Sequence, residues 1–469
     1  MSRIRVLVVD DSVVVRRLVV GALEGDRDID VVGTAANGRI ALDQVTRLRP
    51  HLVTMDIEMP EMDGLEAVQE LRRRGDRFPI IMFSTLTERG AEATLDALAA
   101  GATDYVTKPT NVPDLRAALT DVAQQLLPRI KALVPHVLDA DGGSSDRGTG
   151  SRGAGHDGGA SPEAGRPVSA LRTPLRPLSE ATRRRARRTA ELSGGTGPTP
   201  TSSALRGVTG PRSADAPVTA AARGVPGATA RRPIALAHHA DGAVRPVRAV
   251  VIGASTGGPE ALTRLVASIA RPLPVPVVVV QHMPPVFTRQ LAQRLDRTGG
   301  STVVEAVGGE ELLPGHVYVA PGDHHLELER TARGARTRLT QDPPVNFCRP
   351  AVDTLFRTAV DVYGGDLLAV VLTGMGTDGR TGTGAVVAAG GTVVVQDEAS
   401  SVVWGMPGAV AAAGLAHRVV PIDEMAATVV GLVQRGVDDA GSHADTHPAP
   451  TDTPASRTGA LTPARGGAR

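Results

Sequence analysis

Residues 247–259 read VRAVVIGASTGGP, and this stretch decides the fold of the second half of the chain. The apolar run Val247–Ile252 predicts a buried strand, and the glycines that follow it predict a tight turn. Residues 259–270 have the spacing of an amphipathic helix. A strand, a glycine-rich turn and a helix in succession form the repeating unit of a parallel α/β sheet, with Ser255 exposed in the turn.

Two further segments place a histidine and an aspartate at the ends of predicted strands. His282 follows the apolar run 277–280, and Asp378 lies in the glycine-rich loop after the apolar run 367–372. The carboxyl ends of parallel strands meet at one edge of a sheet, so we expect Ser255, His282 and Asp378 to converge there. These three residue types are the parts of a hydrolytic triad. Their order along the chain differs from that of α/β-hydrolases, which indicates the same chemistry on a different fold.

Other interpretations of this half remain open. A serine in a glycine-rich turn also suits phosphate binding, although neither G-x-G-x-x-G nor G-x-x-x-x-G-K-[ST] is present at residues 253–258. A module that binds partners without catalysis is a second alternative, and the complete set of three polar residues argues against it. Cys348 is an alternative nucleophile, but it has no histidine partner nearby in the sequence.

The first 134 residues show a similar alternation of strand-like and helix-like segments. Five apolar runs alternate with amphipathic stretches, which predicts a doubly wound parallel sheet. The expected strands are 5–9, 30–35, 52–56, 79–84 and 104–108. Residues 247–435 predict a second α/β domain, whose expected strands also include 302–307, 317–320, 326–329, 337–341 and 392–396.

Acidic side chains gather at the strand ends of the first half. Asp10 and Asp11 follow the first predicted strand, and Asp56 ends the third. Three neighbouring carboxylates repel one another unless a divalent cation joins them, and oxygen ligands suit Mg²⁺. Ser84 and Lys108 end the fourth and fifth predicted strands, where a hydroxyl and an ammonium group can hold phosphoryl oxygens.

This half resembles a two-component response-regulator receiver domain, and the same motif includes Met59-Pro60, Asp63-Gly64 and Lys108-Pro109. The resemblance implies a flavodoxin-like fold and phosphorylation of Asp56 by a chemotaxis histidine kinase. The ligands that it implies for Mg²⁺ are Asp11, Asp56 and the carbonyl of Glu58, with Asp10 acting through water. The side chains that it implies as support for the phosphoryl site are Ser84, Tyr105 and Lys108.

The second half resembles the chemotaxis protein-glutamate methylesterase family, whose members also carry a receiver domain before the esterase. The matching segments are VIGASTGG at 251–258, QHMPP at 281–285, PVN at 344–346, RPAVD at 349–353, LTGMGTDG at 372–379 and GMP at 405–407. Together the two resemblances cover about residues 3–130 and 247–435.

This resemblance implies a role for each residue of the expected triad. Ser255 would attack the γ-methyl ester of a glutamate on a methyl-accepting chemoreceptor, His282 would transfer the proton, and Asp378 would orient the histidine. The backbone N–H groups of Thr256 and Met375 would hold the oxyanion. The same site would deamidate certain receptor glutamines, and no cofactor is expected for ester hydrolysis.

Residues 135–246 predict a long disordered linker. From residue 139 onward this segment has no aromatic residue and no lysine, with sixteen arginines and nine acidic residues. Its low apolar content leaves little to offset the entropy of ordering the chain. Residues 436–469 predict a disordered tail, so the expected domains are 1–134 and 247–435. The linker is longer than the usual hinge of the family, and Arg380 replaces a residue that is commonly small there.

The composition sets further limits. The chain has 469 residues, a formal net charge of +1 and a single cysteine, so neither nucleic-acid binding nor an intramolecular disulfide is expected. No apolar run reaches the roughly 20 residues that span a bilayer. The first apolar stretch is too short for a signal-peptide core. We therefore expect a cytoplasmic protein that is not inserted into a membrane.

Overall fold

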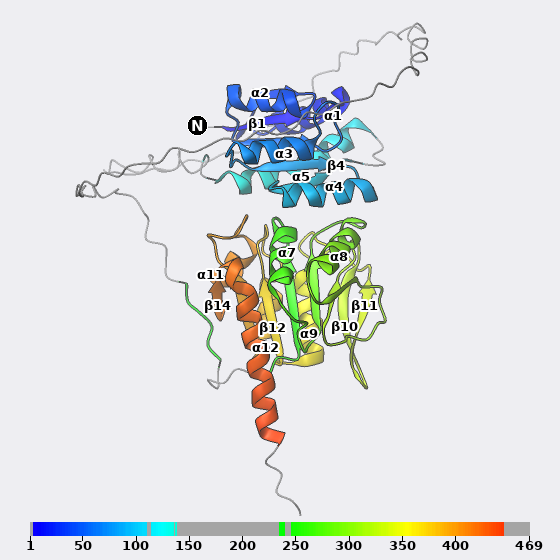
Figure 1. Ribbon diagram of the computed structural model, residues 1–469, viewed down its shortest axis with the longest axis vertical. Coiled ribbons are helices and arrows are strands. Elements are labelled where there is room, and N and C mark those ends of the chain that lie inside the picture. Colours follow the sequence, from blue (N-terminus) through cyan, green and yellow to red (C-terminus); the bar gives the residue numbers. More distant parts are fainter. Residues whose placement is uncertain (1–2, 110–113, 136, 138–233, 240–244, 445–469) are drawn as a thin grey trace, which may run out of the picture. The chain divides into compact units, whose positions relative to one another are not determined.

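The computed structural model describes residues 3–109, 114–135, 137, 234–239 and 245–444, which belong to one compact unit. Most of the predicted linker, and residues 445–469 of the predicted tail, lie outside the described residues. The first domain is a five-stranded parallel sheet in the order β2-β1-β3-β4-β5 (Figure 1). Its strands are β1 (Ile4–Val9), β2 (Ile29–Ala35), β3 (Leu52–Asp56), β4 (Ile80–Ser84) and β5 (Asp104–Thr107).

Five helices cover the two faces of this sheet. They are α1 (Val13–Glu24), α2 (Gly38–Leu48), α3 (Gly64–Arg73), α4 (Glu88–Ala99) and α5 (Leu115–Leu133). Val6 and Val8 of β1 share a core with α1 and α5, whereas Leu7 and Val9 share a core with α2, α3 and α4. This is the alternation expected of a strand that is buried on both sides. The prediction of five parallel strands is confirmed, with bounds that differ by no more than one residue at either end.

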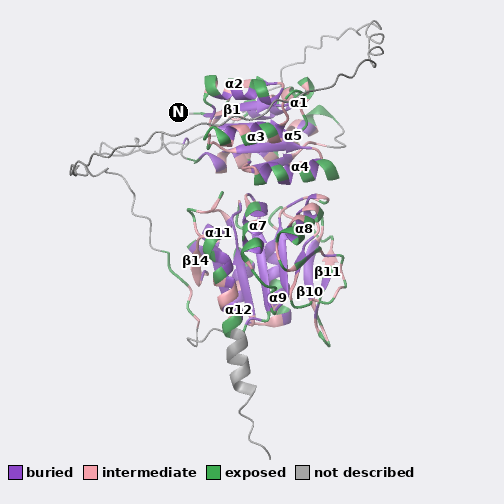
Figure 2. Ribbon diagram, viewed as in Figure 1, coloured by how far each residue is buried: buried purple, intermediate pink, exposed green. Residues whose placement is uncertain are grey.

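Polar residues determine where these helices begin. Each helix is preceded by a side chain that accepts a hydrogen bond from a backbone N–H of its first turn. The residues concerned are Ser12, Asn37, Asp63, Thr87 and Asp114. The strands are mostly buried, and the helices present exposed residues on their outer sides (Figure 2).

The second domain is built on a seven-stranded parallel sheet in the order β14-β13-β12-β6-β7-β9-β8. Its strands are β6 (Ala249–Ala254), β7 (Val277–Gln281), β8 (Thr302–Glu305), β9 (His316–Val319), β12 (Leu367–Val371), β13 (Thr392–Gln396) and β14 (Arg418–Val420). Its helices are α7 (Gly258–Ser268), α8 (Phe287–Thr298), α9 (Val352–Tyr363), α10 (Arg380–Ala388), α11 (Met406–Ala412) and α12 (Ile422–Ala444). Helices α7, α8 and α12 share one core with the sheet, and α9, α10 and α11 share the other.

Three features differ from the sequence expectation. Two segments predicted as strands, 326–329 and 337–341, form a separate antiparallel hairpin of β10 (His325–Thr331) and β11 (Gly334–Thr340). Helix α12 continues past residue 435 to Ala444. The Ala237 N–H, inside the predicted linker, donates to the Ala416 carbonyl at 2.8 Å. Among the described residues, no helix is both long and apolar enough to cross a bilayer.

Candidate functional site

The sheet of the second domain has its topological switch point between β6 and β12. From these neighbouring strands the chain proceeds to opposite edges of the sheet, which opens a crevice at their carboxyl ends. Ser255 follows β6, His282 follows β7, and Asp378 lies in the loop after β12. The Ser255 N–H donates to the Thr373 carbonyl at 3.0 Å, and the His282 N–H donates to the Ala254 carbonyl at 3.1 Å. These bonds join the three segments that carry the predicted residues.

His282 is partly buried and forms a pair with the buried Asp378. The His282 Nε2 lies 2.8 Å from the Asp378 Oδ2, and the Asp378 side chain is only 3% exposed. Burial alone would raise the pKa of Asp378, but the hydrogen bond from His282 and those from backbone N–H groups outweigh it and lower the pKa. Asp378 is therefore a carboxylate at neutral pH.

The start of helix α9 fixes the Asp378 carboxylate. The N–H of Val352 donates to Oδ2 at 2.7 Å, and the N–H of Asp353 donates to Oδ1 at 3.1 Å. Backbone N–H groups at a helix N-terminus stabilise a negative charge. The side-chain amide of Asn346 also donates to Asp378 Oδ1 at 3.0 Å and to the Asp353 carboxylate at 2.9 Å. The sequence prediction did not assign roles to Asn346 and Asp353, although both lie in quoted motifs.

The other ring nitrogen of His282 faces Cys348. The Cys348 Sγ lies 3.5 Å from Nδ1, whereas the Ser255 hydroxyl makes no hydrogen bond to any described residue. Burial lowers the pKa of His282, but the hydrogen bonds with Asp378 and Cys348 outweigh this effect and raise the pKa to about 9. No local pattern predicts the contact between Cys348 and His282, because the two residues are 66 positions apart.

The turn that carries Ser255 packs tightly against the loop after β12. A Cβ atom on Gly374 would lie 2.9 Å from the Ser255 Cβ, and one on Gly258 would lie 1.9 Å from the Gln281 Oε1. Only glycine fits these two positions without displacing the turn. Thr256 follows Ser255 directly and Met375 follows Gly374 directly, and their backbone N–H groups donate to no other described group. Free N–H groups beside a nucleophile are the donors that an oxyanion needs.

The first domain brings three of its acidic residues together. Oxygens of Asp10, Asp11 and Asp56 lie within 4.8 Å of one another. The Lys108 Nζ lies 2.9 Å from the Asp10 carboxylate and 2.8 Å from that of Asp56. Burial and the charge of Asp10 raise the pKa of Asp56 to about 6, against the opposing effect of Lys108. Three carboxylates opposed by one ammonium group suit a hard divalent cation such as Mg²⁺.

A hollow of about 290 Å³ opens beside these carboxylates. Ser84, Lys108 and Glu58 line it, as does Asp11. The Ser84 hydroxyl donates to the Gly90 carbonyl at 3.2 Å. Tyr105 does not line this hollow; its ring stacks on Phe287 of the second domain at a centroid distance of 4.7 Å. Arg380 is exposed at the first position of α10.

Contacts between the two domains reach the turn that carries Ser255. The Thr256 hydroxyl donates to the Asp104 carboxylate of β5 at 2.9 Å. A hollow of about 360 Å³ is lined by His282 and Cys348 on one side and by residues of the first domain, including Tyr105 and Arg129, on the other.

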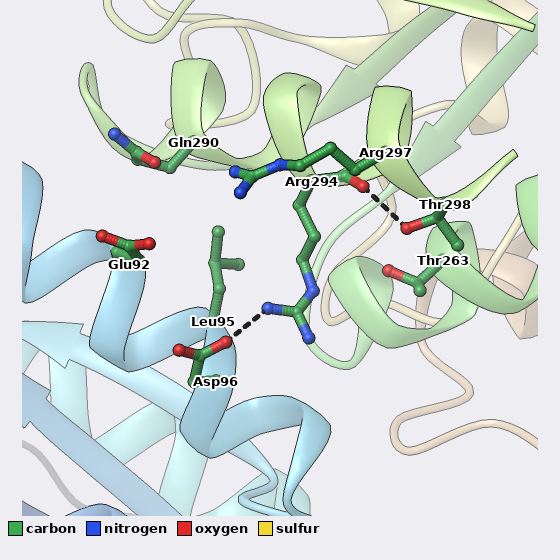
Figure 3. A pocket seen from close by; sticks show the side chains of 8 residues that line it. All are labelled: Glu92, Leu95, Asp96, Thr263, Gln290, Arg294, Arg297 and Thr298. Atoms are coloured by element: carbon green, nitrogen blue, oxygen red, sulfur yellow. Dashed lines mark hydrogen bonds and ion pairs between the residues drawn. The ribbon is translucent and has the colours of Figure 1, made fainter.

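A second hollow between the domains, of about 240 Å³, lies where α4 meets α7 and α8 (Figure 3). There the Arg294 guanidinium of α8 reaches the Asp96 carboxylate of α4 at 2.7 Å. This ion pair is partly exposed, so solvent weakens its attraction.

The chain is similar to known proteins over both domains. The family model for CheB methylesterase matches residues 250–429, and that for the response regulator receiver domain matches residues 6–120. A protein-glutamate methylesterase/protein-glutamine glutaminase of Nocardioides sp. is 49% identical over 435 residues, which are 93% of this chain and 97% of the relative. A relative of the same name from Trichodesmium erythraeum is 36% identical, with 92% of this chain and 99% of the relative covered.

Two solved structures from Thermotoga maritima match single domains. Its CheB methylesterase catalytic domain is 44% identical, with a TM-score of 0.39, and the match covers 40% of this chain and 99% of that chain. The response regulator domain of its CheB is 40% identical, with a TM-score of 0.25, and the match covers 28% of this chain and 94% of that chain.

Proposed function

Because the chain belongs to the CheB methylesterase family and carries a response regulator receiver domain, we propose that it is a phosphorylation-activated protein-glutamate methylesterase. Its substrates would be glutamate γ-methyl esters on methyl-accepting chemoreceptors, and it would also deamidate receptor glutamines. The observation that carries this proposal is the hydrogen-bonded His282–Asp378 pair, which lies at the switch point beside the Ser255 turn. That pair can take a proton from a nucleophile and return it to a leaving group.

The first half of the reaction forms an acyl-enzyme. The Ser255 Oγ attacks the ester carbonyl carbon while His282 Nδ1 takes the hydroxyl proton, so the Oγ must approach the nitrogen that now faces Cys348. The carbonyl oxygen becomes an oxyanion, which the N–H groups of Thr256 and Met375 would hold. Each such donor typically contributes about 10²–10³-fold to the rate. The tetrahedral intermediate then expels methanol, which leaves with the proton from His282.

The second half of the reaction restores the enzyme. A water molecule attacks the acyl carbon, and His282 takes one of its protons. The Ser255 oxygen leaves with that proton, and a free glutamate side chain is released. Asp378 stabilises the imidazolium in both halves, because its carboxylate is already fixed by backbone N–H groups. With a glutamine side chain the same steps would release ammonia in place of methanol.

The receiver domain would control this activity through Asp56. Asp10, Asp11 and Asp56, with the Glu58 carbonyl, would hold Mg²⁺, which neutralises the charge of the carboxylates and of the incoming phosphoryl group. Lys108 already contacts two of these carboxylates, and it would also contact a phosphoryl group on Asp56. The phosphoryl donor would be a chemotaxis histidine kinase. Because such kinases and the methylated helices of receptors lie in the cytoplasm, we place the protein there.

Contacts between the domains support inhibition of the esterase by the unphosphorylated receiver. Residues of the receiver line the hollow that contains His282, and Asp104 accepts a hydrogen bond from Thr256 in the proposed oxyanion turn. A receptor helix cannot occupy the same space as the receiver. Phosphorylation would relieve this inhibition by separating the two domains.

Methanol release from a methylated chemoreceptor tests the proposal. The full-length protein is assayed with and without acetyl phosphate and Mg²⁺. We expect methanol in both cases and a faster release with the phosphodonor. If no methanol appears under either condition, the proposed activity is wrong. If methanol appears at the same rate in both, the esterase assignment stands and the proposed control by phosphorylation is wrong.

A further inference from the structure

Phe347 is a fully exposed aromatic residue next to the candidate site. Its exposed fraction is 103%, whereas Phe83, Phe287 and Phe356 are almost completely buried. The chain contains only five phenylalanines. A single exposed ring is ordinary on a protein surface and adds nothing to the hydrophobic core, so any role of Phe347 must follow from its backbone and its neighbours.

The backbone holds this ring in an unusual conformation. Asn346 and Phe347 have φ angles of 53° and 64°, both in the left-handed region. Val345 and Cys348 exchange two backbone hydrogen bonds, of 3.1 and 2.9 Å, which close a two-residue turn around them. Glycine or asparagine is the ordinary choice at the second position of such a turn, and a bulky side chain is disfavoured there. Phenylalanine at this position therefore works against local stability.

The turn is fixed to the candidate active site on both sides of Phe347. The preceding residue, Asn346, donates hydrogen bonds to Asp378 and Asp353, and the following residue, Cys348, contacts His282. Phe347 itself lines the same hollow as His282 and Cys348. Although receiver residues line that hollow as well, the ring stays fully exposed. The backbone of Phe347 is thus held at the rim of the site, and no described part of the chain covers its ring.

We propose that Phe347 is a docking residue for the protein substrate, which rests on the function proposed above. The partner is a helix that carries a glutamate γ-methyl ester, with an aliphatic or aromatic side chain three or four positions away. Residues at these spacings lie on the same face of a helix, so the apolar side chain would pack on the ring while the ester enters the hollow. The ring and an apolar side chain would attract each other by burying apolar surface, so neither partner needs a charge. Phe347 therefore determines selectivity for the protein substrate over a small ester.

The test compares a protein ester with a small ester in the full-length protein with acetyl phosphate. The substrates are a methylated chemoreceptor and N-acetylglutamate γ-methyl ester, which is too short to contact the ring. The variant Phe347→Gly removes the ring and suits the left-handed backbone, and Phe347→Leu keeps an apolar side chain. Val307→Ala is the matched control, because Val307 is 80% exposed and does not line the hollow.

The measured quantity is the ratio of kcat/KM for the receptor to kcat/KM for the small ester. We expect Phe347→Gly to lower this ratio about tenfold through a higher KM for the receptor, the usual effect of losing one aromatic anchor. Phe347→Leu should retain most of the ratio, and Val307→Ala should retain all of it. A ratio for Phe347→Gly within twofold of the parent overturns the docking role.

A binding measurement separates this proposal from the esterase assignment. The affinity of Ser255→Ala for the methylated receptor is compared with that of the double variant Ser255→Ala/Phe347→Gly. We expect about tenfold weaker binding by the double variant. If the parent protein releases no methanol but this loss of affinity is found, the docking role stands and the esterase assignment fails. Equal affinities overturn the docking role whether or not the parent is active.

Discussion

The Cys348 Sγ lies 3.5 Å from His282 Nδ1, the ring nitrogen that a catalytic serine would use. The opposite nitrogen, Nε2, is bonded to Asp378 at 2.8 Å. His282 therefore has a partner on each side, and Ser255 must replace the thiol before it can transfer its proton. This arrangement makes the thiol a competitor of the proposed nucleophile and gives Cys348 an influence on the pKa of the catalytic base.

Replacement of Cys348 should change the pH dependence of hydrolysis. The contacts with Asp378 and Cys348 outweigh burial and raise the pKa of His282 to about 9, and only the neutral imidazole accepts a proton from serine. For the parent protein, kcat/KM should increase about tenfold per pH unit below this pKa. In Cys348→Ala the pKa of His282 should be lower. The increase in kcat/KM should therefore occur at lower pH, and kcat/KM near pH 7 should be higher. Profiles of kcat/KM from pH 6 to 10 measure this shift, and identical midpoints in the two proteins would contradict it.

Asn346 should be important for orienting Asp378. Its amide donates to the carboxylates of Asp378 and Asp353, both of which are buried. Asn346→Gly keeps the left-handed backbone but removes the amide, so we expect a loss of about 1–3 kcal/mol in the free energy of unfolding. The value of kcat should fall by about 10–100-fold, because a misplaced carboxylate orients His282 poorly. A variant with normal kcat and reduced stability would show that the amide supports only the fold.

Removal of the Asp56 charge should stabilise the protein. In the folded state the pKa of Asp56 is raised by burial to about 6, compared with 3.8 for an ordinary aspartate. The folded protein then binds a proton more readily than the unfolded chain, so stability falls as pH rises from about 4 through about 6 and stays lower above that. Asp56→Asn should raise the free energy of unfolding at pH 7 by about 1–3 kcal/mol and have little effect below pH 4.

Denaturant unfolding at the two pH values, with and without Mg²⁺, measures this effect. Mg²⁺ should stabilise the parent protein much more than Asp56→Asn, because the variant lacks one of the three carboxylates. The variant should also accept no phosphoryl group from acetyl phosphate. Equal stabilisation at pH 4 and pH 7 would show that the gain does not come from the Asp56 charge.

The ion pair between Asp96 and Arg294 should contribute to inhibition of the unphosphorylated protein. Its partly exposed position predicts a modest contribution, so Asp96→Ala should raise methanol release without phosphodonor by about two- to fivefold. The rate with acetyl phosphate should not change. Glu70→Ala is a matched control, because it breaks ion pairs with Arg73 and Arg74 within the receiver domain alone. An esterase domain of residues 245–444 that is no faster than the unphosphorylated full chain would contradict inhibition by the receiver.

The sequence predicts the parts of this fold that depend on local pattern. Strands β1, β3 and β4 are largely apolar runs between turn residues, so their bounds follow from side-chain chemistry. The convergence of the segments with Ser255, His282 and Asp378 follows from the rule that parallel strands end at one edge. Cys348 and Asn346 reach the site through a loop that folds back on the sheet, and no periodic pattern in the sequence encodes that path. The β10–β11 hairpin likewise depends on tertiary packing, since its strand segments do not reveal which strands they pair with.

The most direct test of the proposed mechanism compares Ser255→Ala with Cys348→Ala in one assay of methanol release from methylated chemoreceptor, with acetyl phosphate present. If Ser255 is the nucleophile, Ser255→Ala should be slower than the parent by about 10³-fold or more, whereas Cys348→Ala should retain substantial activity. A near-normal rate from Ser255→Ala, or a comparable loss of activity in Cys348→Ala alone, would contradict the proposed role of the serine.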